Sequence, residues 1–233
     1  MKRLLFIGDV HSNLPRFKQL LNTEKVDAVF QVGDFELYHS IESASADKKA
    51  LKKNGELVKQ TIEWLNSKNL EPFKTPIYFI NGNHEDFDNF ESETLKKLNI
   101  NYIKPGTIVN IDGVNVAGIG GIHSSVKVAW RTQDLKGQDK RFYTEADVNL
   151  LYRKAWGKKI DVFITHQAAS NILPKGTDHE GTFYFENIIK DMKPSYYFHG
   201  HHHKNYTTKY NDTEIYGLGN FGKNPKSYKI IEI

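Results

Sequence analysis

The chain has 233 residues, 39% of them hydrophobic and 12% aromatic, and a formal charge of +4 at pH 7. This composition indicates a folded globular protein with a substantial core. The mild basic excess favours an anionic partner, or serves solubility alone, and excludes the dense positive charge of dedicated nucleic-acid binders. Cysteine is absent, which excludes disulfides and thiolate metal sites and leaves histidine nitrogen and carboxylate or amide oxygen as metal ligands.

No stretch of the sequence has the roughly 20 consecutive apolar residues of a membrane span. The apolar run at the N-terminus ends at Gly8 and Asp9, which is too short for a secretory signal. We therefore expect a soluble, cytoplasmic protein with no membrane partner.

The first half of the chain alternates apolar strands with amphipathic helices. The runs RLLFIG (3–8), DAVFQVG (27–33) and PIYFING (76–82) are continuously apolar and closed by glycine, as expected for strands buried on both faces. Helical spacing follows in residues 14–22 and 45–68, where Asn54-Gly55 is a candidate interruption.

A second sheet is expected from residue 107 onward, because residues 107–121 alternate around Asp112-Gly113, a strong hairpin signal. Helices are expected at 145–156 and 184–191. Further strands are expected at 160–166, 194–200, 205–210, 214–220 and 227–233. No linker separates the halves, so we expect one domain over residues 1–233, with two sheets face to face and helices outside.

Polar residues recur at the carboxyl ends of these predicted strands, the edge where open α/β sheets bind their ligands. They are Asp9 and His11, Asp34, Asn83 and His84, His166, and His201 with His203. Each has an ordinary explanation as a turn, cap or hydrogen-bonded residue. Five such motifs at matching positions indicate one shared site.

The tract FHGHHHK (198–204) contains four histidines within five positions. Residues two apart in an extended segment point the same way, so Asp9 with His11, and His201 with His203, are expected to converge on one spot. His199 and His202 are expected to support the ligands or to face solvent.

The ligand set is large enough for two divalent ions that share the carboxylate of Asp34. One site would consist of Asp9, His11, Asp34 and His203, and the other of Asp34, Asn83, His166 and His201. Such ligands suit Mn, Fe, Zn or Ni, of which we favour Mn. Two ions roughly 3.5–4 Å apart clamp both oxygens of an in-line displacement, and a water between them becomes hydroxide near neutral pH. The predicted chemistry is phosphoester hydrolysis by that hydroxide.

The motifs GDVH (8–11), GD (33–34), GNHE (82–85), TH (165–166) and GHHH (200–203) resemble those of the calcineurin-like metallophosphoesterases. The resemblance extends from residue 2 to about residue 220 and agrees with the ligand set above. It implies an α/β fold, a four-layer α/β/β/α sandwich of two mixed sheets flanked by helices. It also implies that His84 is the general acid that protonates the leaving oxygen.

Two departures from the family pattern affect the site. Many members support the acid histidine with an aspartate three residues after the Gly-Asp aspartate, where this chain has Leu37. His84 is therefore expected to have another orienting partner or to be held less firmly. The segments GDFE (33–36), NGNHE (81–85) and VNVAGIGGIHSS (114–125), with the basic stretch that ends in RFYTEADV (141–148), look most similar to the RNA lariat debranching enzymes. Those enzymes hydrolyse a 2′,5′-phosphodiester, and many have cysteine at the position of Asp9. Aspartate is expected to strengthen the first metal site, and the choice between 2′,5′ and 3′,5′ linkages stays open.

Residues 123–159 contain nine Lys and Arg against four Asp and Glu, interleaved with aromatic residues, a pattern that suits a phosphate backbone with stacked bases. The candidate substrate contacts are His123, Lys127, Arg131, Arg141 and Tyr143. The alternative is a solvated loop followed by a helix.

The leading hypothesis is a phosphodiesterase acting on RNA, DNA or a nucleotide. A phosphomonoesterase of proteins or small molecules would share every metal ligand. A monoester needs extra positive groups for its dianion, whereas a diester needs room on both sides of phosphorus. A noncatalytic scaffold of the same fold is disfavoured, because such a protein tends to lose ligands that this chain retains.

Overall fold

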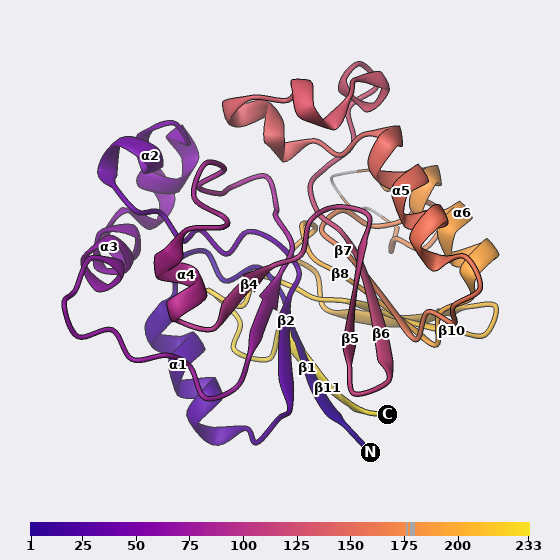
Figure 1. Ribbon diagram of the computed structural model, residues 1–233, viewed down its shortest axis with the longest axis horizontal. Coiled ribbons are helices and arrows are strands. Elements are labelled where there is room, and N and C mark those ends of the chain that lie inside the picture. The colour runs from indigo at the N-terminus through magenta and orange to yellow at the C-terminus, as the bar shows by residue number, and fades with distance from the viewer. Residues whose placement is uncertain (176, 178–179) are drawn as a thin grey trace.

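Two β-sheets packed face to face form the centre of the protein (Figure 1). This computed structural model describes residues 1–175, 177 and 180–233. The first sheet has the strand order β11-β1-β2-β3-β4, in which β11 alone is antiparallel to its neighbour. Its strands are β1 (Arg3–Ile7), β2 (Ala28–Gln31), β3 (Ile77–Phe79), β4 (Ile100–Tyr102) and β11 (Tyr228–Glu232).

The second sheet has the order β5-β6-β7-β8-β10-β9 and is also mixed. Strands β6, β7, β8 and β10 are parallel, and the edge strands β5 and β9 are antiparallel to their neighbours. Its strands are β5 (Thr107–Ile111), β6 (Val114–Ile119), β7 (Val162–Thr165), β8 (Tyr196–His199), β9 (Tyr206–Tyr210) and β10 (Thr213–Gly217).

Helices cover the outer faces of both sheets and complete four layers (Figure 1). On the first sheet they are α1 (Leu14–Thr23), α3 (Lys48–Leu65) and α4 (Glu93–Lys97), and on the second α5 (Glu145–Ala155) and α6 (Phe183–Met192). Helix α2 (Ile41–Ser45) packs against α3. The short 3-10 helices η1 (Lys127–Ala129), η2 (Thr132–Asp134) and η3 (Gly137–Arg141) precede α5. Across the described ranges, no helix combines the length and the apolar character needed to span a bilayer.

The apolar strands are buried on both faces, as their sequences predict. In β1, Leu5 packs among the residues under the helices, whereas Leu4 and Phe6 pack between the sheets. The ring of Phe6 stacks on Phe198 of β8 in the opposite sheet, with centroids 3.9 Å apart. The expected four-layer α/β/β/α sandwich is therefore confirmed.

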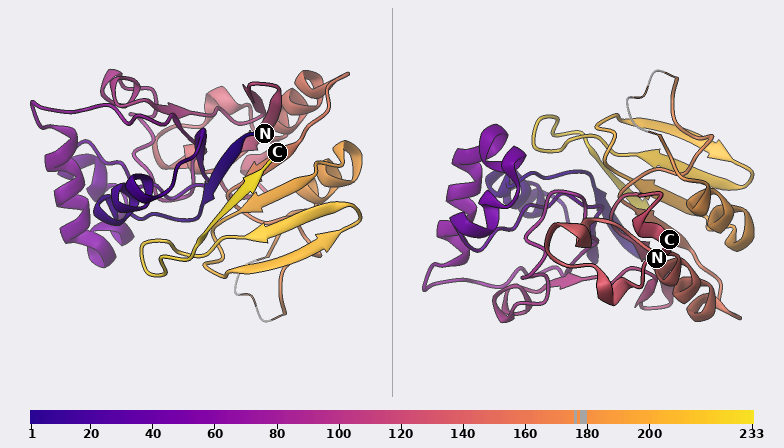
Figure 2. Two further views of the ribbon diagram at one scale, coloured as in Figure 1. Left: turned by 90° about the horizontal axis from the view of Figure 1, so that it is seen from below. Right: turned by 90° about the horizontal axis from the view of Figure 1, so that it is seen from above.

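The structure differs from the sequence expectation in several elements. The last strand, β11, pairs with β1 in the first sheet rather than joining the second, which places the two termini side by side (Figure 2). The short strand β4 and helix α4 were not expected. The helical region expected at 45–68 is α3, which Asp47 caps and in which Asn54 breaks the regular helix at the predicted interruption. The short helix α2 precedes this region and was not expected.

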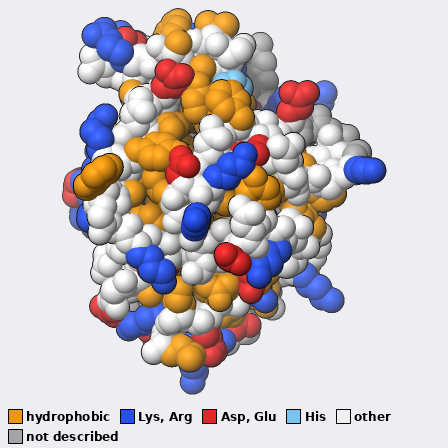
Figure 3. All heavy atoms as spheres, turned by 90° about the vertical axis from the view of Figure 1, so that its right-hand side faces the viewer, with side chains coloured by type: hydrophobic (Ala, Val, Ile, Leu, Met, Phe, Trp, Pro, Cys, Tyr) orange, Lys and Arg blue, Asp and Glu red, His pale blue; other side chains and the backbone are white. Residues whose placement is uncertain are grey.

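The remaining surface gives no continuous basic face in the view toward α5 and α6. Figure 3 shows Lys and Arg interspersed with Asp and Glu and with exposed hydrophobic groups among the described residues of that side. The part of this side that the structure describes therefore offers no extended surface for a polyanion.

Candidate functional site

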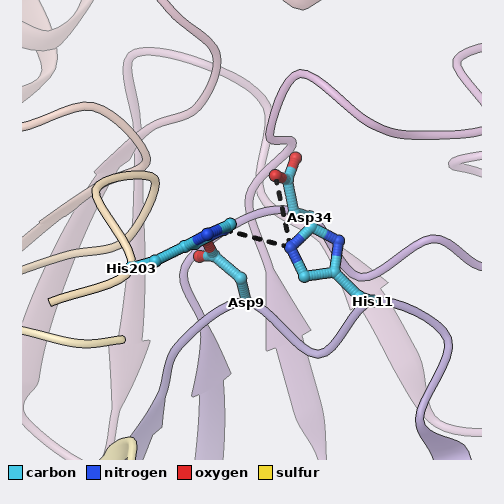
Figure 4. A group of neighbouring side chains, drawn as sticks. All are labelled: Asp9, His11, Asp34 and His203. Atoms are coloured by element: carbon cyan, nitrogen blue, oxygen red, sulfur yellow. Dashed lines mark hydrogen bonds and ion pairs between the residues drawn. The ribbon is translucent and has the colours of Figure 1, made fainter. Parts of the chain in front are cut away.

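Four predicted ligands meet where β1, β2 and β8 end. Asp9, His11, Asp34 and His203 each offer one ligand atom, and these atoms lie within 4.8 Å of one another (Figure 4). Nε2 of His203 lies 3.0 Å from Oδ2 of Asp9 and 3.2 Å from Nε2 of His11. Two imidazoles and two carboxylates that point at one spot are a donor set that fits a divalent transition metal.

A second group of predicted ligands lies on the other side of Asp34. Nε2 of His166 is 3.5 Å from Oδ1 of Asp34 and 3.2 Å from Oδ1 of Asn83. The ring of His201 packs edge-on against that of His166, with centroids 4.9 Å apart. Because Oδ2 of Asp34 faces His11 at 4.0 Å, its two oxygens point to the two groups. The structure thus brings all seven predicted metal ligands together.

Two of the predicted ligand histidines, His11 and His166, are oriented by contacts of their Nδ1 atoms. Nδ1 of His166 donates to the carbonyl of Val32 at 2.9 Å, and Nδ1 of His11 lies 2.6 Å from Oε1 of the buried Glu36. These contacts leave Nε2 free to bind metal. Burial opposes protonation of His11, but Glu36, Asp34 and Asp9 outweigh it and raise the pKa of His11 to about 9. The carboxylates around this ring therefore favour a cation, which a metal ion would supply in place of the proton.

Left-handed backbone conformations turn the ligands inward. The φ angles are 48° at His11, 55° at Asp34, 66° at His201 and 53° at His203. We expected Asp9 with His11, and His201 with His203, to converge because their segments are extended. That reason is wrong, although the convergence itself is observed. Such conformations are uncommon for residues with a side chain and are found at functional sites.

Glycines beside the ligands make the close packing feasible. A Cβ atom built on Gly82 would overlap Oδ1 of Asp34, and one built on Gly200 would overlap Oδ1 of Asp9. At Gly33, where φ is +97°, it would overlap the ring of His166. Each of these glycines belongs to a motif of the sequence, and each is required because a ligand from a distant segment lies against its backbone.

Asp47 orients His84, in place of the aspartate that many family members have at the position of Leu37. Nδ1 of His84 lies 2.5 Å from Oδ2 of Asp47, and the backbone N–H of His84 donates to Oδ1 of Asp34 at 2.8 Å. The other oxygen of Asp47 caps helix α3 by accepting from the N–H of Lys49 and Ala50. Burial opposes protonation of His84, but Asp47 and Asp34 outweigh it and raise the pKa of His84.

Sequence reasoning missed Asp47, Glu36 and Glu85. The buried Glu85 accepts hydrogen bonds from the N–H groups of Phe35, Glu36 and Gly82, so it ties the loop after β2 to the loop after β3. Burial and the nearby Asp34 raise the pKa of Glu85 well above its usual range. Glu85 is the last residue of the GNHE motif and Glu36 follows the GD motif closely, which was the available signal. Asp47 lies in no motif.

The two other histidines of the tract are buried. His199 donates from Nδ1 to the carbonyl of Gly200, and its Nε2 lies 2.6 Å from the hydroxyl of Tyr206. Nε2 of His202 accepts from the N–H of Ala168 at 3.3 Å. The alternative that they face solvent is wrong, because both are bonded within the protein.

A cleft of about 760 Å³ adjoins the ligands and is lined by His84 together with Lys49, Lys53 and Arg141. Of the five candidate substrate contacts, Arg141 lies in this lining. The prediction that Tyr143 contacts substrate is wrong. Its ring is fully buried and its hydroxyl donates to Thr182, so it does not reach the cleft.

The other three candidates lie outside the described lining of the cleft. Lys127 pairs with Asp139 at 2.6 Å, Arg131 pairs with Asp134 at 2.8 Å, and Nδ1 of His123 lies 3.3 Å from the hydroxyl of Tyr143. Their roles as substrate contacts stay predictions.

Comparison with known proteins gives one family. Residues 2–205 match the family model described as Calcineurin-like phosphoesterase. Lariat debranching enzymes of Schizosaccharomyces pombe and Entamoeba histolytica are 24% and 25% identical to this chain over 86% and 64% of its length, and 48% and 49% of theirs. The chain thus spans about half the length of these relatives. TT1561 of Thermus thermophilus shares the fold, with a TM-score of 0.63 and 12% identity over 99% of this chain and 98% of that chain.

The packing of Gly82 against Asp34 gives a direct test of the site's construction. In Gly82→Ala we expect Asp34 to be displaced, which should remove most of the rise in Tm on adding Mn²⁺ and lower kcat/KM roughly 10²-fold. Gly55→Ala is the matched control, because a Cβ there meets no atom within 4 Å. A Gly82→Ala protein with a full Mn²⁺-induced shift would contradict the described packing.

Proposed function

The chain belongs to the calcineurin-like phosphoesterases, and we propose that it is a phosphodiesterase that cleaves a linkage in a nucleic acid or nucleotide. It is a metal-dependent hydrolase of phosphoester bonds, as its family is. The observation that carries the finer proposal is the position of His84, held by Asp47 at the edge of a cleft beside the metal ligands.

We propose that two divalent ions bind on either side of Asp34. Asp9, His11 and His203 would hold one, and Asn83, His166 and His201 the other, with Asp34 shared. When bound, the ions would activate water and offset the charge that develops on the phosphoryl oxygens. Imidazole together with carboxylate and amide oxygen suits Mn²⁺, which we favour.

His84 is proposed as the acid that protonates the leaving oxygen. Its Nδ1 is occupied by Asp47, which leaves Nε2 to carry the transferred proton. Tyr38 also donates to Oδ2 of Asp47 at 3.2 Å, so the carboxylate has a fixed orientation. The negative charge of Asp47 stabilises the imidazolium form of His84, and its position keeps the ring aimed in one direction.

The size of the cleft supports a diester, because about 760 Å³ leaves room for groups on both sides of phosphorus. The curated relatives are lariat debranching enzymes, which favours RNA as the substrate class. Phosphomonoester hydrolysis is the second candidate, since a monoester would use the same metal ligands.

Metal reconstitution separates these two candidates. Protein stripped with a chelator is expected to be inactive, and added Mn²⁺ to restore turnover. We expect kcat/KM for bis(p-nitrophenyl) phosphate to exceed that for p-nitrophenyl phosphate by roughly tenfold or more, which is about 1.4 kcal/mol in transition-state stabilisation. A preference for the monoester would reject the diesterase proposal. Dinucleotides with 2′,5′ and 3′,5′ links then identify the linkage.

The acid role predicts an effect that depends on the leaving group. In His84→Ala, kcat should fall roughly 10²–10⁴-fold for a dinucleotide, whose alkoxide needs a proton, and much less for a p-nitrophenyl ester. Asp47→Asn should also lower kcat more for the dinucleotide than for the p-nitrophenyl ester, but by a smaller factor than His84→Ala. The single amide oxygen of asparagine cannot both cap α3 and accept from His84.

The control for these variants is His39→Ala. This histidine also lies against a buried aspartate, Asp86, but it is not among the residues that line the cleft. Turnover of His39→Ala should equal that of the wild type. If His84→Ala lost equal activity on both classes of leaving group, the acid role would be wrong.

A further inference from the structure

Three cations line the cleft beside His84, and they come from two distant segments. Lys49 and Lys53 lie four residues apart near the start of α3, so they share one face of that helix. Arg141 ends η3, which precedes α5. These side chains are not metal ligands, since each is a cation, and the proposed reaction assigns them no task.

Their charges are not neutralised within the protein. Neighbouring cations are paired: Lys127 with Asp139 and Lys140 with Asp88, both at 2.6 Å. In the part of the chain that the structure describes, no carboxylate pairs with Lys49, Lys53 or Arg141. Nε of Arg141 is buried and has no hydrogen-bond partner among the described residues. An unsatisfied buried donor costs free energy, and a ligand that accepts a hydrogen bond from Nε would remove that cost.

The carboxylates that line the cleft are already engaged. Asp34 accepts from the N–H groups of Asn83 and His84, and Asp47 is bonded to His84, Tyr38 and the start of α3. The three cations have no ion-pair partner among the described residues, so they are available to an anion that enters the cleft. Such charge concentrates anions in a cleft.

The position of Lys49 and Lys53 indicates which phosphate group of a substrate they would contact. Asp47 holds His84 and, through its other oxygen, accepts from the N–H of Lys49. The lysines thus lie on the side of the acid, where the leaving group must be. The extra charge of a monoester dianion would instead sit on the scissile phosphate, next to the metal ligands.

We propose that Lys49, Lys53 and Arg141 form a subsite for a second phosphate, carried by the leaving nucleoside. The guanidinium would bind two phosphate oxygens in its planar fork, and the ammonium groups would act as point charges. This inference rests on the proposed diesterase function and names its substrate class: a strand with a phosphate on the leaving side of the scissile diester, rather than an isolated diester.

The test compares Mn²⁺-loaded enzyme on dinucleotides of one linkage. The first has no terminal phosphate, the second carries a phosphate on the leaving nucleoside, and the third carries it on the other nucleoside. A trinucleotide extended on the leaving side separates an internal diester from a terminal phosphate. We expect kcat/KM to be roughly tenfold or more higher for the second dinucleotide and for the trinucleotide, mostly through KM.

Substitutions assign this preference to the three side chains. Lys49→Ala, Lys53→Ala and Arg141→Ala should each reduce this preference roughly threefold to tenfold, because kcat/KM falls more for the phosphorylated dinucleotide than for the unphosphorylated one. Arg141→Lys should recover part of it, which excludes misfolding as the cause. Lys52→Ala and Lys140→Ala are matched controls, because these neighbouring lysines are outside the described lining of the cleft and should keep the full preference.

Equal kcat/KM with and without the leaving-side phosphate would overturn the subsite and leave the diesterase function standing. A preference for the phosphate on the other nucleoside would overturn the assigned side. A loss in Lys52→Ala as large as that in Lys53→Ala would overturn the assignment to these residues in favour of general surface charge. Enzyme that cleaves none of the diesters would overturn the proposed function itself.

Discussion

The carboxylate of Asp34 is the point on which the site depends. Its Oδ1 accepts from two successive N–H groups after β3 and lies 3.5 Å from His166, while Oδ2 faces His11. One side chain thus joins the loops that follow β1, β2, β3 and β7. An anion that is only 2% exposed is costly to bury unless positive groups surround it. Histidines and the proposed metal ions supply positive charge around the Asp34 carboxylate. The need to compensate this buried charge explains why five distant motifs converge.

The sandwich positions these motifs through its apolar core. Phe6 and Phe198 stack across the two sheets, and each precedes a ligand, Asp9 or His201, by three residues. The N–H of His201 then donates to the carboxylate of Asp9, which links the sheets by a polar contact just beyond the stack. Packing of the rings therefore sets the distance between ligands from the two halves of the chain. A rigid core below and hydrogen-bonded loops above give a preorganised site, in which Asp47 bonds to His84 and Glu85 bonds to the loop after β2.

The strands, and the residues that the structure brings together around Asp34, could be predicted because their signals are local. An apolar run closed by glycine and a polar residue identifies both a buried strand and its functional end. The partner of His84 could not be predicted, because Asp47 lies 37 positions away and is recognisable only as a helix cap. The burial of Tyr143 and the pairing of β11 with β1 likewise depend on which distant segments pack together. Left-handed conformations at His11 and His203 had no sequence signal, since such residues normally avoid them.

The central claim is that two ions share Asp34. A crystal structure of the Mn²⁺-loaded protein, with anomalous diffraction measured at the manganese edge, tests it most directly. The account predicts two anomalous peaks on opposite sides of the Asp34 carboxylate, one contacting His11 and His203 and the other contacting His166 and His201. A single peak, or peaks remote from Asp34, would contradict it.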